Sequence, residues 1–131
     1  MSYAYDDQNI FAKILRGEIP NDTVAETDHS LAFNDIAPKA PVHVLVIPKG
    51  AYVTADHFFA KASEAEIADF WRLVGKISSE KGVAPGAGGN GYRLISNAGP
   101  DGFQEVPHFH VHIAGGTRLG AILGDDPANR K

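Results

Sequence analysis

The sequence predicts an α+β domain with a mainly antiparallel five-stranded sheet, one short N-terminal helix and one long helix. Two segments carry apolar residues at helical spacing, and the β-prone segments are short and bounded by turn residues. The expected order is helix, hairpin, strand, long helix, strand, strand, which favours an antiparallel sheet. At 131 residues, the chain is expected to form one domain over 1–131, with a core over about 9–120 and a polar tail over about 121–131.

The first helix is expected at about 8–16, with Asp7 as the candidate N-cap. Gly17 and Pro20 are the stop signals that follow it. The apolar residues of this helix recur on one stripe: Ile10, Phe11, Ile14 and Leu15. This stripe predicts a helix that buries one face.

Two β-prone pieces at about 23–26 and 30–34 are separated by three turn-forming residues, and this predicts a hairpin. The following segment, "PVHVLVIPKG", is rich in β-branched residues and ends at Pro48 and Gly50. It contains His43 among apolar neighbours. We expect it to be a buried central strand.

The long helix is expected to begin at Ser63, where "SEAE" matches a capping box completed by Glu66. Gly82 lies where a C-terminal cap belongs. Phe70 and Trp71 belong to the apolar stripe of this helix, and their spacing favours core packing over stacking on a ligand. Two strands, "GYRLISN" and "VPHFHVHIA", complete the expected sheet.

The segment "GAGGNG" at 86–91 fits the pattern G-x-G-x-x-G. A dinucleotide-binding loop follows a strand and opens a helix, so that helix N–H groups face the pyrophosphate. Here the expected order is helix, loop, strand, and a flexible connector is the better interpretation.

Composition restricts the function. Hydrophobic residues make up 44% and charged residues 21% of the chain, no apolar run approaches a membrane span, and no signal peptide is evident, so a soluble cytoplasmic protein is expected. The absence of cysteine excludes disulfides, thiolate metal sites and a cysteine nucleophile. The net charge of -4, with dispersed lysines and arginines, argues against bulk nucleic acid as a partner.

The stretch "HFHVHIA" at 108–114 is the strongest functional signal. On a strand, His108, His110 and His112 would share one face, and the apolar residues between them would share the other. Three imidazoles plus water form a known catalytic zinc shell, but ligands at every second position of one strand lie nearly in line. Alternatively, the middle imidazole is a nucleophile whose neighbours orient it and, by mutual repulsion, keep its lone pair free.

This stretch, followed by Gly115 and Gly116, resembles the H-x-H-x-H-x-x signature of the histidine-triad family. Further segments resemble the Hint branch of purine-nucleotide-binding hydrolases in order and spacing: "NIFAKILRGEIP", "LAFNDIAPKAPVHVLVIPK", "GYRLISNAG" and "DGFQEVPHFHVHIAGG". The likeness covers most of 9–120. It implies hydrolysis rather than nucleotidyl transfer, because the transferase branch typically has glutamine where this chain has His112.

The resemblance implies roles for particular residues. His110 corresponds to the nucleophile that attacks the α-phosphorus, and His112 to a phosphate-contacting partner that also helps to protonate the leaving group. His43 and His108 correspond to the histidines that orient and relay protons. Asp35 resembles the acid that accepts hydrogen bonds from both ribose hydroxyls. The walls of the base pocket would be Ile10, Phe11, Ile14, Ile19, Phe33 and Ile36.

Other positions concern the leaving group. Asn97 and Gln104 resemble polar residues near the phosphate and leaving group. Glu105 stands where some relatives have serine. Its carboxylate would bring negative charge toward an anionic phosphate, so its main-chain N–H is the expected phosphate contact. Two further departures bear on leaving-group preference: Phe103, where a relative has glycine, and Pro107, where the family often has an aromatic residue.

The expected function is therefore hydrolysis of purine nucleoside 5′-phosphoramidates, or related nucleotide conjugates, through a nucleotidyl-histidine intermediate. The resemblance implies a homodimer in which two sheets join, and neither a cofactor nor a metal is demanded. Two alternatives stay open: a nucleotide-binding regulatory or interaction module whose turnover is incidental, and a zinc-dependent hydrolase.

Overall fold

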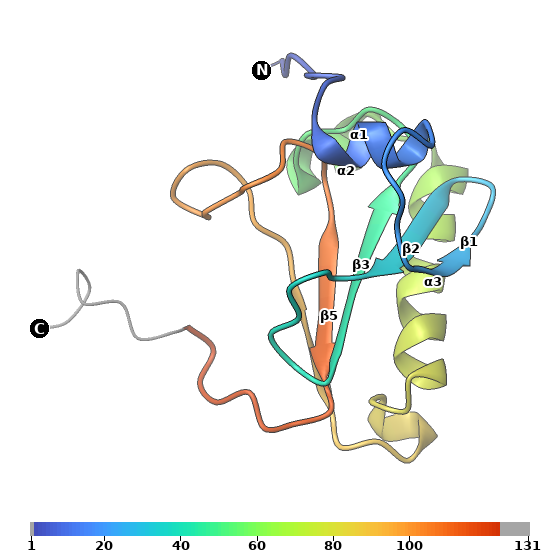
Figure 1. Ribbon diagram of the computed structural model, residues 1–131, viewed down its shortest axis with the longest axis vertical. Helices are drawn as coiled ribbons and strands as arrows, with labels where there is room; N and C mark the ends of the chain where they lie inside the picture. The colour runs from blue at the N-terminus through green and yellow to red at the C-terminus, as the bar shows by residue number, and fades with distance from the viewer. Residues whose placement is uncertain (1, 124–131) are drawn as a thin grey trace, which may run out of the picture.

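The computed structural model describes residues 2–123, and Figure 1 shows them as a sheet with helices on both sides. The expected polar tail lies largely outside the described residues. The elements in chain order are α1 (Ile10–Leu15), β1 (Thr23–Glu26), β2 (Ser30–Asn34), β3 (Val42–Pro48), α2 (Ala55–Lys61), α3 (Glu64–Glu80), the 3-10 turn η1 (Pro85–Ala87), β4 (Tyr92–Ile95) and β5 (Val111–Gly115).

The five strands form one antiparallel sheet in the order β1-β2-β3-β5-β4, which confirms the predicted class. β3 lies at its centre, between β2 and β5, as its β-branched composition predicted. In the β3–β5 register, His43 is opposite Ala114 and Leu45 is opposite His112. His43 and His112 are therefore diagonal neighbours on the same face of the sheet.

α3 covers one face of the sheet and forms the main core. Its residues Phe70, Leu73, Val74 and Ile77 pack with Val44, Val46, Phe109, Val111 and Ile113. Phe70 is fully buried and Trp71 packs against this cluster, which confirms core packing for the aromatic pair. The capping box is confirmed as well, because Glu66 N–H donates to Ser63 Oγ at 3.1 Å and Ser63 N–H to Glu66 Oε1 at 3.0 Å.

α1 covers the opposite face, where it forms a second and smaller core. Phe11 packs there with Leu31, Phe33, Leu45 and Ile47 from the strands. Because side chains alternate along a strand, this face receives the residues that α3 does not contact. The catalytic candidates also project from this face, and their surroundings are therefore set by α1.

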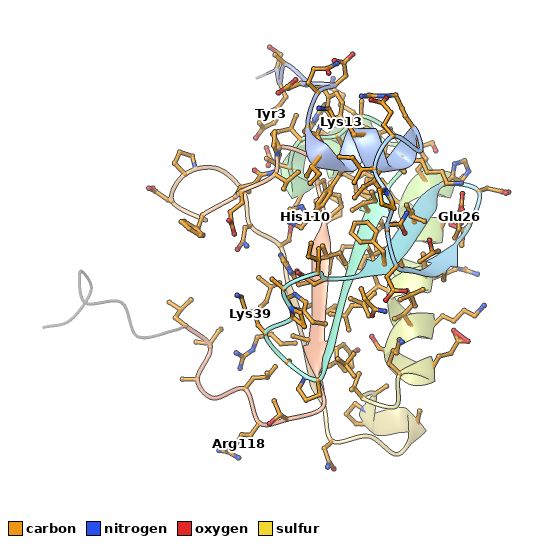
Figure 2. The ribbon with its side chains drawn as sticks, viewed as in Figure 1. Tyr3, Lys13, Glu26, Lys39, His110 and Arg118 are labelled. Carbon is orange, nitrogen blue, oxygen red and sulfur yellow. The ribbon has the colours of Figure 1, made fainter. Side chains whose placement is uncertain are left out.

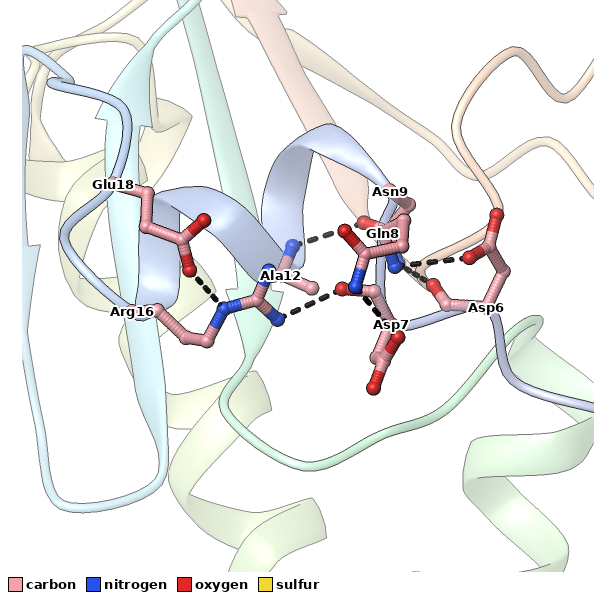
Figure 3. Close-up of polar contacts among 7 residues, drawn as sticks. All are labelled: Asp6, Asp7, Gln8, Asn9, Ala12, Arg16 and Glu18. Carbon is pink, nitrogen blue, oxygen red and sulfur yellow. Dashed lines mark hydrogen bonds and ion pairs between the residues drawn. The ribbon is translucent and has the colours of Figure 1, made fainter.

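The expected bounds of the first helix need correction. α1 begins at Ile10, and its N-cap is Asn9 rather than Asp7. Asn9 Oδ1 accepts a hydrogen bond from Ala12 N–H at 2.9 Å (Figure 3). Both residue types make good N-caps, so the sequence alone did not distinguish them. The helix stops before Gly17, whose φ of 78° glycine adopts without steric cost.

α2 is a helix that the sequence analysis missed. Its seven residues bury one large side chain, Phe58, and its N-cap Thr54 accepts a hydrogen bond from His57 N–H at 3.3 Å. Two turns are too short for helical periodicity to be recognised. The prediction of one short and one long helix was therefore incomplete.

The last strand is shorter than expected, because pairing begins at Val111. His108 and His110 precede it. Their backbone turns away from the sheet: Phe109 N–H donates to the Tyr52 carbonyl at 2.7 Å and His108 N–H to the Val106 carbonyl at 2.8 Å. The alternation of faces nevertheless persists, since Phe109 lies in the α3 core while the ring of His110 meets Phe11 of α1.

The glycine-rich segment 86–91 connects α3 to β4 and contains the end of η1. The observed order of helix, loop and strand confirms that it is not built as a dinucleotide-binding loop. Within residues 2–123, no helix is both long and apolar enough to cross a membrane.

Candidate active site

Four histidines gather on the α1 side of the sheet. His43 comes from β3, His112 from β5, and His108 and His110 from the segment just before β5. Figure 2 shows His110 near the start of β5, beneath α1. The rings of His110 and His112 have centroids 5.1 Å apart, and those of His43 and His112 are also 5.1 Å apart. The fold thus places all four predicted histidines in one cluster.

The hydrogen bonds of His110 determine which of its nitrogens carries the proton. Its Nδ1 lies 2.7 Å from the carbonyl oxygen of His108. A carbonyl can only accept, so Nδ1 carries the hydrogen and the neutral ring has its lone pair on Nε2. Phe11 closes one side of the ring at a centroid distance of 5.0 Å. His110 therefore presents an unprotonated nitrogen, which is what a nucleophile requires.

His108 is locked in the opposite tautomer. Its Nε2 lies 2.8 Å from the carbonyl oxygen of Pro48 and must be the protonated nitrogen. Its Nδ1 lies 2.6 Å from the hydroxyl oxygen of Tyr5 and is the acceptor of that bond. Both nitrogens are used, and the side chain is fully buried. His108 is consequently a structural support for the site rather than a group that meets substrate.

His43 and His112 form a directed pair. Lys39 N–H donates to His43 Nδ1 at 3.0 Å, so Nδ1 is an acceptor and the ring hydrogen of His43 is on Nε2. That hydrogen points to His112 Nδ1 at 2.9 Å, with a carboxylate oxygen of Asp35 3.4 Å away. His112 then carries its own hydrogen on Nε2. A free lone pair on His110 thus lies next to an N–H donor on His112.

The electrostatics favour neutral imidazoles. Burial, helped by repulsion from His110, lowers the pKa of His108 to about 4. Burial, with repulsion from His110 and His43, also lowers the pKa of His112 to about 4. Burial lowers the pKa of His110 as well, although its bond to the His108 carbonyl and the charges of Asp35 and Glu105 oppose this. At neutral pH the attacking lone pair is therefore available.

Among the described residues, Asp35, His43 and His112 could group around a metal ion, with donor atoms within 4.8 Å of one another. This set differs from the three triad histidines that the zinc hypothesis named. It fits a cation poorly, because His43 Nδ1 already accepts from Lys39 N–H. A metal on His43 Nε2 would displace the only ring hydrogen and require an imidazolate or the loss of that backbone bond.

A pocket of about 530 Å³ opens beside Asp35. This size is typical of small-molecule sites, and its apolar walls suit a flat aromatic base. Its lining residues are Ile14, Pro20, Asn21, Asp22, Phe33, Asn34, Asp35 and Ile36. Ile36 is 96% exposed at the edge of this pocket, so its side chain is free to contact a ligand there. Asp35 Oδ1 accepts from Ala37 N–H at 2.8 Å, so the carboxylate is held at the pocket edge.

The predicted base-pocket residues are only partly brought together. Ile14, Phe33 and Ile36 line the pocket, and Phe11 packs edge-on to Phe33 with ring centroids 5.6 Å apart. Ile10 is 47% exposed, and neither it nor Ile19 lines the pocket. The polar side of the pocket was not predicted from the sequence; it consists of Asn21, Asp22 and Asn34. Their only signal was proximity to Asp35 and to the turn at Pro20.

The residues expected near the leaving group lie in the loop before the triad. The side-chain amide of Gln104 hydrogen-bonds to the protein backbone. It accepts from Gly99 N–H at 3.0 Å and donates to the carbonyls of Val53 at 2.7 Å and Val106 at 3.0 Å. It is thus a brace rather than a free phosphate ligand. Glu105 is exposed, yet near enough to His110 to act on its pKa.

The other three positions expected near the leaving group range from half-buried to exposed. Asn97 is half-buried, Pro107 is exposed just before the triad, and Phe103 is 74% exposed. Phe103 has a φ of 57°, a left-handed conformation that is rare for a bulky side chain. Such strain is often found at functional sites.

The HIT domain family matches residues 16–119 of the chain. A 13.2 kDa HIT-like protein of Azospirillum brasilense is 54% identical over 94% of this chain and 98% of its own length. The purine nucleoside phosphoramidase of Escherichia coli K12 is 40% identical over 89% of this chain and 94% of its own length. Among solved structures, a HIT family hydrolase from Legionella pneumophila is 37% identical, covers 88% of this chain and 98% of its own, and superposes with a TM-score of 0.77.

These matches extend through the histidine cluster, the central strands and the pocket residues beyond position 16. They agree with the family resemblance that the histidine pattern indicated. The chain belongs to the HIT family.

Proposed function

We propose that this protein hydrolyses purine nucleoside 5′-phosphoramidates, or related nucleotide conjugates, by a double displacement on His110. The observation that carries the proposal is the pairing of a free Nε2 lone pair on His110 with an N–H donor on His112, beside an apolar pocket. Membership of the HIT family and similarity to a purine nucleoside phosphoramidase support hydrolase activity on nucleotides.

In the first step, His110 Nε2 forms a bond to the α-phosphorus, the bond from phosphorus to the leaving amine breaks, and the amine takes up one proton. The Nε2–H of His112 contacts a phosphoryl oxygen and assists that protonation. In the second step, water attacks phosphorus, the bond to His110 breaks, and one proton is released. The net reaction consumes one water and yields the nucleoside monophosphate and the free amine.

The base and ribose occupy the pocket described above. Apolar side chains of Phe33 and Ile36 face the purine, and the carboxylate of Asp35 accepts from the ribose hydroxyls. Negative charge on the phosphoryl oxygens would be stabilised by the Nε2–H of His112, and such donors are usually the largest electrostatic contribution to these reactions.

The test is a chemical quench during turnover with an α-labelled adenosine phosphoramidate. Wild-type protein should carry label in an acid-labile, base-stable bond. His110→Ala should lose the label and about 10³-fold in kcat while still binding nucleotide, because a covalent step is removed rather than a binding contact. His29→Ala, outside the cluster, is the matched control and should keep both label and activity.

Two alternatives predict different results. A zinc-dependent hydrolase, which would have to use the grouping of Asp35, His43 and His112 despite its poor fit to a cation, should lose activity to a chelator, regain it with zinc and form no covalent nucleotide. A nucleotide-binding module should bind the monophosphate but show no multiple turnover. Label on His110 together with chelator-resistant turnover would decide against both.

We also propose that the protein is a homodimer. β4 is an edge strand of the sheet, and its Tyr92, Leu94 and Ile95 are 38%, 41% and 37% exposed. An apolar edge with unpaired backbone groups favours association with another sheet edge. Joining the sheets of two copies through β4 would cover it.

A further inference from the structure

The segment before α1 reaches the histidine cluster through Tyr5. The hydroxyl oxygen of Tyr5 lies 2.6 Å from His108 Nδ1, and the two rings meet edge-on with centroids 5.6 Å apart. A second tyrosine of this segment, Tyr3, which is labelled in Figure 2, donates instead to an exposed carboxylate oxygen of Asp56 at 2.6 Å and stacks on His57. Only the first of these bonds leads to the site.

The direction of the Tyr5 bond is determined by the other side of His108. Because the Pro48 carbonyl accepts from His108 Nε2–H, Nδ1 of the neutral ring has a lone pair and the Tyr5 hydroxyl must donate. His108 is fully buried, so solvent does not replace that donor. Without it, a buried acceptor would be left without a partner, which is unfavourable and which the ring can relieve by moving.

A movement of His108 would reach the nucleophile. The His108 carbonyl is the acceptor that orients His110 Nδ1–H, at 2.7 Å, and thereby aims Nε2. We propose that Tyr5 is a positioning residue for His110, acting through the chain of bonds from the Tyr5 hydroxyl to the His108 ring and from the His108 carbonyl to the His110 ring. The proposal goes beyond the proposed function but rests on it for the role of His110.

The segment that carries Tyr5 is itself held in place, as Figure 3 shows. Asn9 accepts from Ala12 N–H at 2.9 Å and donates from Nδ2 to the Asp6 carbonyl at 2.7 Å. Arg16 Nη1 donates to the Asp7 carbonyl at 2.8 Å. Residues 6–9 are thus fastened to α1, and α1 in turn packs Phe11 against His110. The phenol is therefore presented to His108 by an ordered support.

The experiment compares Tyr5→Phe with Tyr3→Phe, which lose the same atom from neighbouring tyrosines. Tyr5→Phe should lower kcat for a phosphoramidate about tenfold and leave KM within about twofold, because ground-state contacts to the nucleotide are untouched. Tyr3→Phe should leave both constants within about twofold. Equal kcat values for the two variants would overturn the proposal.

Two further measurements separate positioning from packing. Tyr5→Leu removes the ring as well as the hydroxyl. If kcat falls in Tyr5→Leu but stays at the wild-type value in Tyr5→Phe, Tyr5 acts through packing and the proposal is overturned. Nitrogen-15 NMR of the histidine rings should find His110 as a single Nδ1–H tautomer in wild type and as a mixture, or with shifted resonances, in Tyr5→Phe. Unchanged His110 signals would also overturn it. This measurement needs no substrate, so inactivity of the wild type would count against the proposed function alone.

Discussion

Lowering the pH should destabilise the fold through His108. Its pKa falls from 6.5 to about 4 on folding, mainly because the ring is buried. The unfolded chain therefore binds a proton at higher pH than the folded chain, and stability is lost as pH falls from about 6.5 to about 4. This difference in pKa between the unfolded and folded chain corresponds to about 3 kcal/mol of folding stability in total. Of this, about 2 kcal/mol is lost between pH 7 and pH 5.

The free energy of unfolding can be measured at pH 7, 6 and 5 by urea denaturation at one fixed protein concentration. The signal is the fluorescence of the single tryptophan, Trp71. Wild type contains other buried histidines, so the informative quantity is the comparison with His108→Gln, whose amide can donate to the Pro48 carbonyl but does not titrate. The variant should lose about 2 kcal/mol less than wild type over this range. His29→Gln controls for the loss of one histidine. Parallel losses in wild type and His108→Gln would refute the reasoning.

Further substitutions have defined outcomes. Asp35→Ala should raise KM and erase any preference for ribo- over 2′-deoxyribonucleotides, and steady-state kinetics with both sugars would show an intact preference if Asp35 does not contact the ribose. Phe103→Gly should stabilise the fold by up to about 1 kcal/mol in urea denaturation, since it relieves a φ of 57° at a side chain that is 74% exposed; a destabilised variant would mean that the ring packs. Leu94→Lys should convert the proposed dimer to a monomer in light scattering at micromolar concentration, and a wild type that is already monomeric would contradict the dimer.

The sequence by itself determined the parts of the fold that depend on local pattern. The hairpin, the central strand and the capped long helix each carry a repeat or a terminal signal within a few residues, and each was confirmed. The alternating histidines likewise indicated a functional site, because three imidazoles at every second position have few purposes. The family follows from the same residues.

Tertiary structure decided what depends on contacts between distant segments. The tautomers of His108 and His110 follow from the carbonyls of Pro48 and His108, and no sequence pattern reports where those oxygens point. The bond from Tyr5 to His108 joins residues 103 positions apart. Strand pairing starts at Val111 because the backbone N–H of Phe109, two residues earlier, donates to the Tyr52 carbonyl instead. The local sequence does not indicate this contact either. Residue types supply the reactive groups, but proton positions depend on partners that only the folded chain brings within hydrogen-bonding distance.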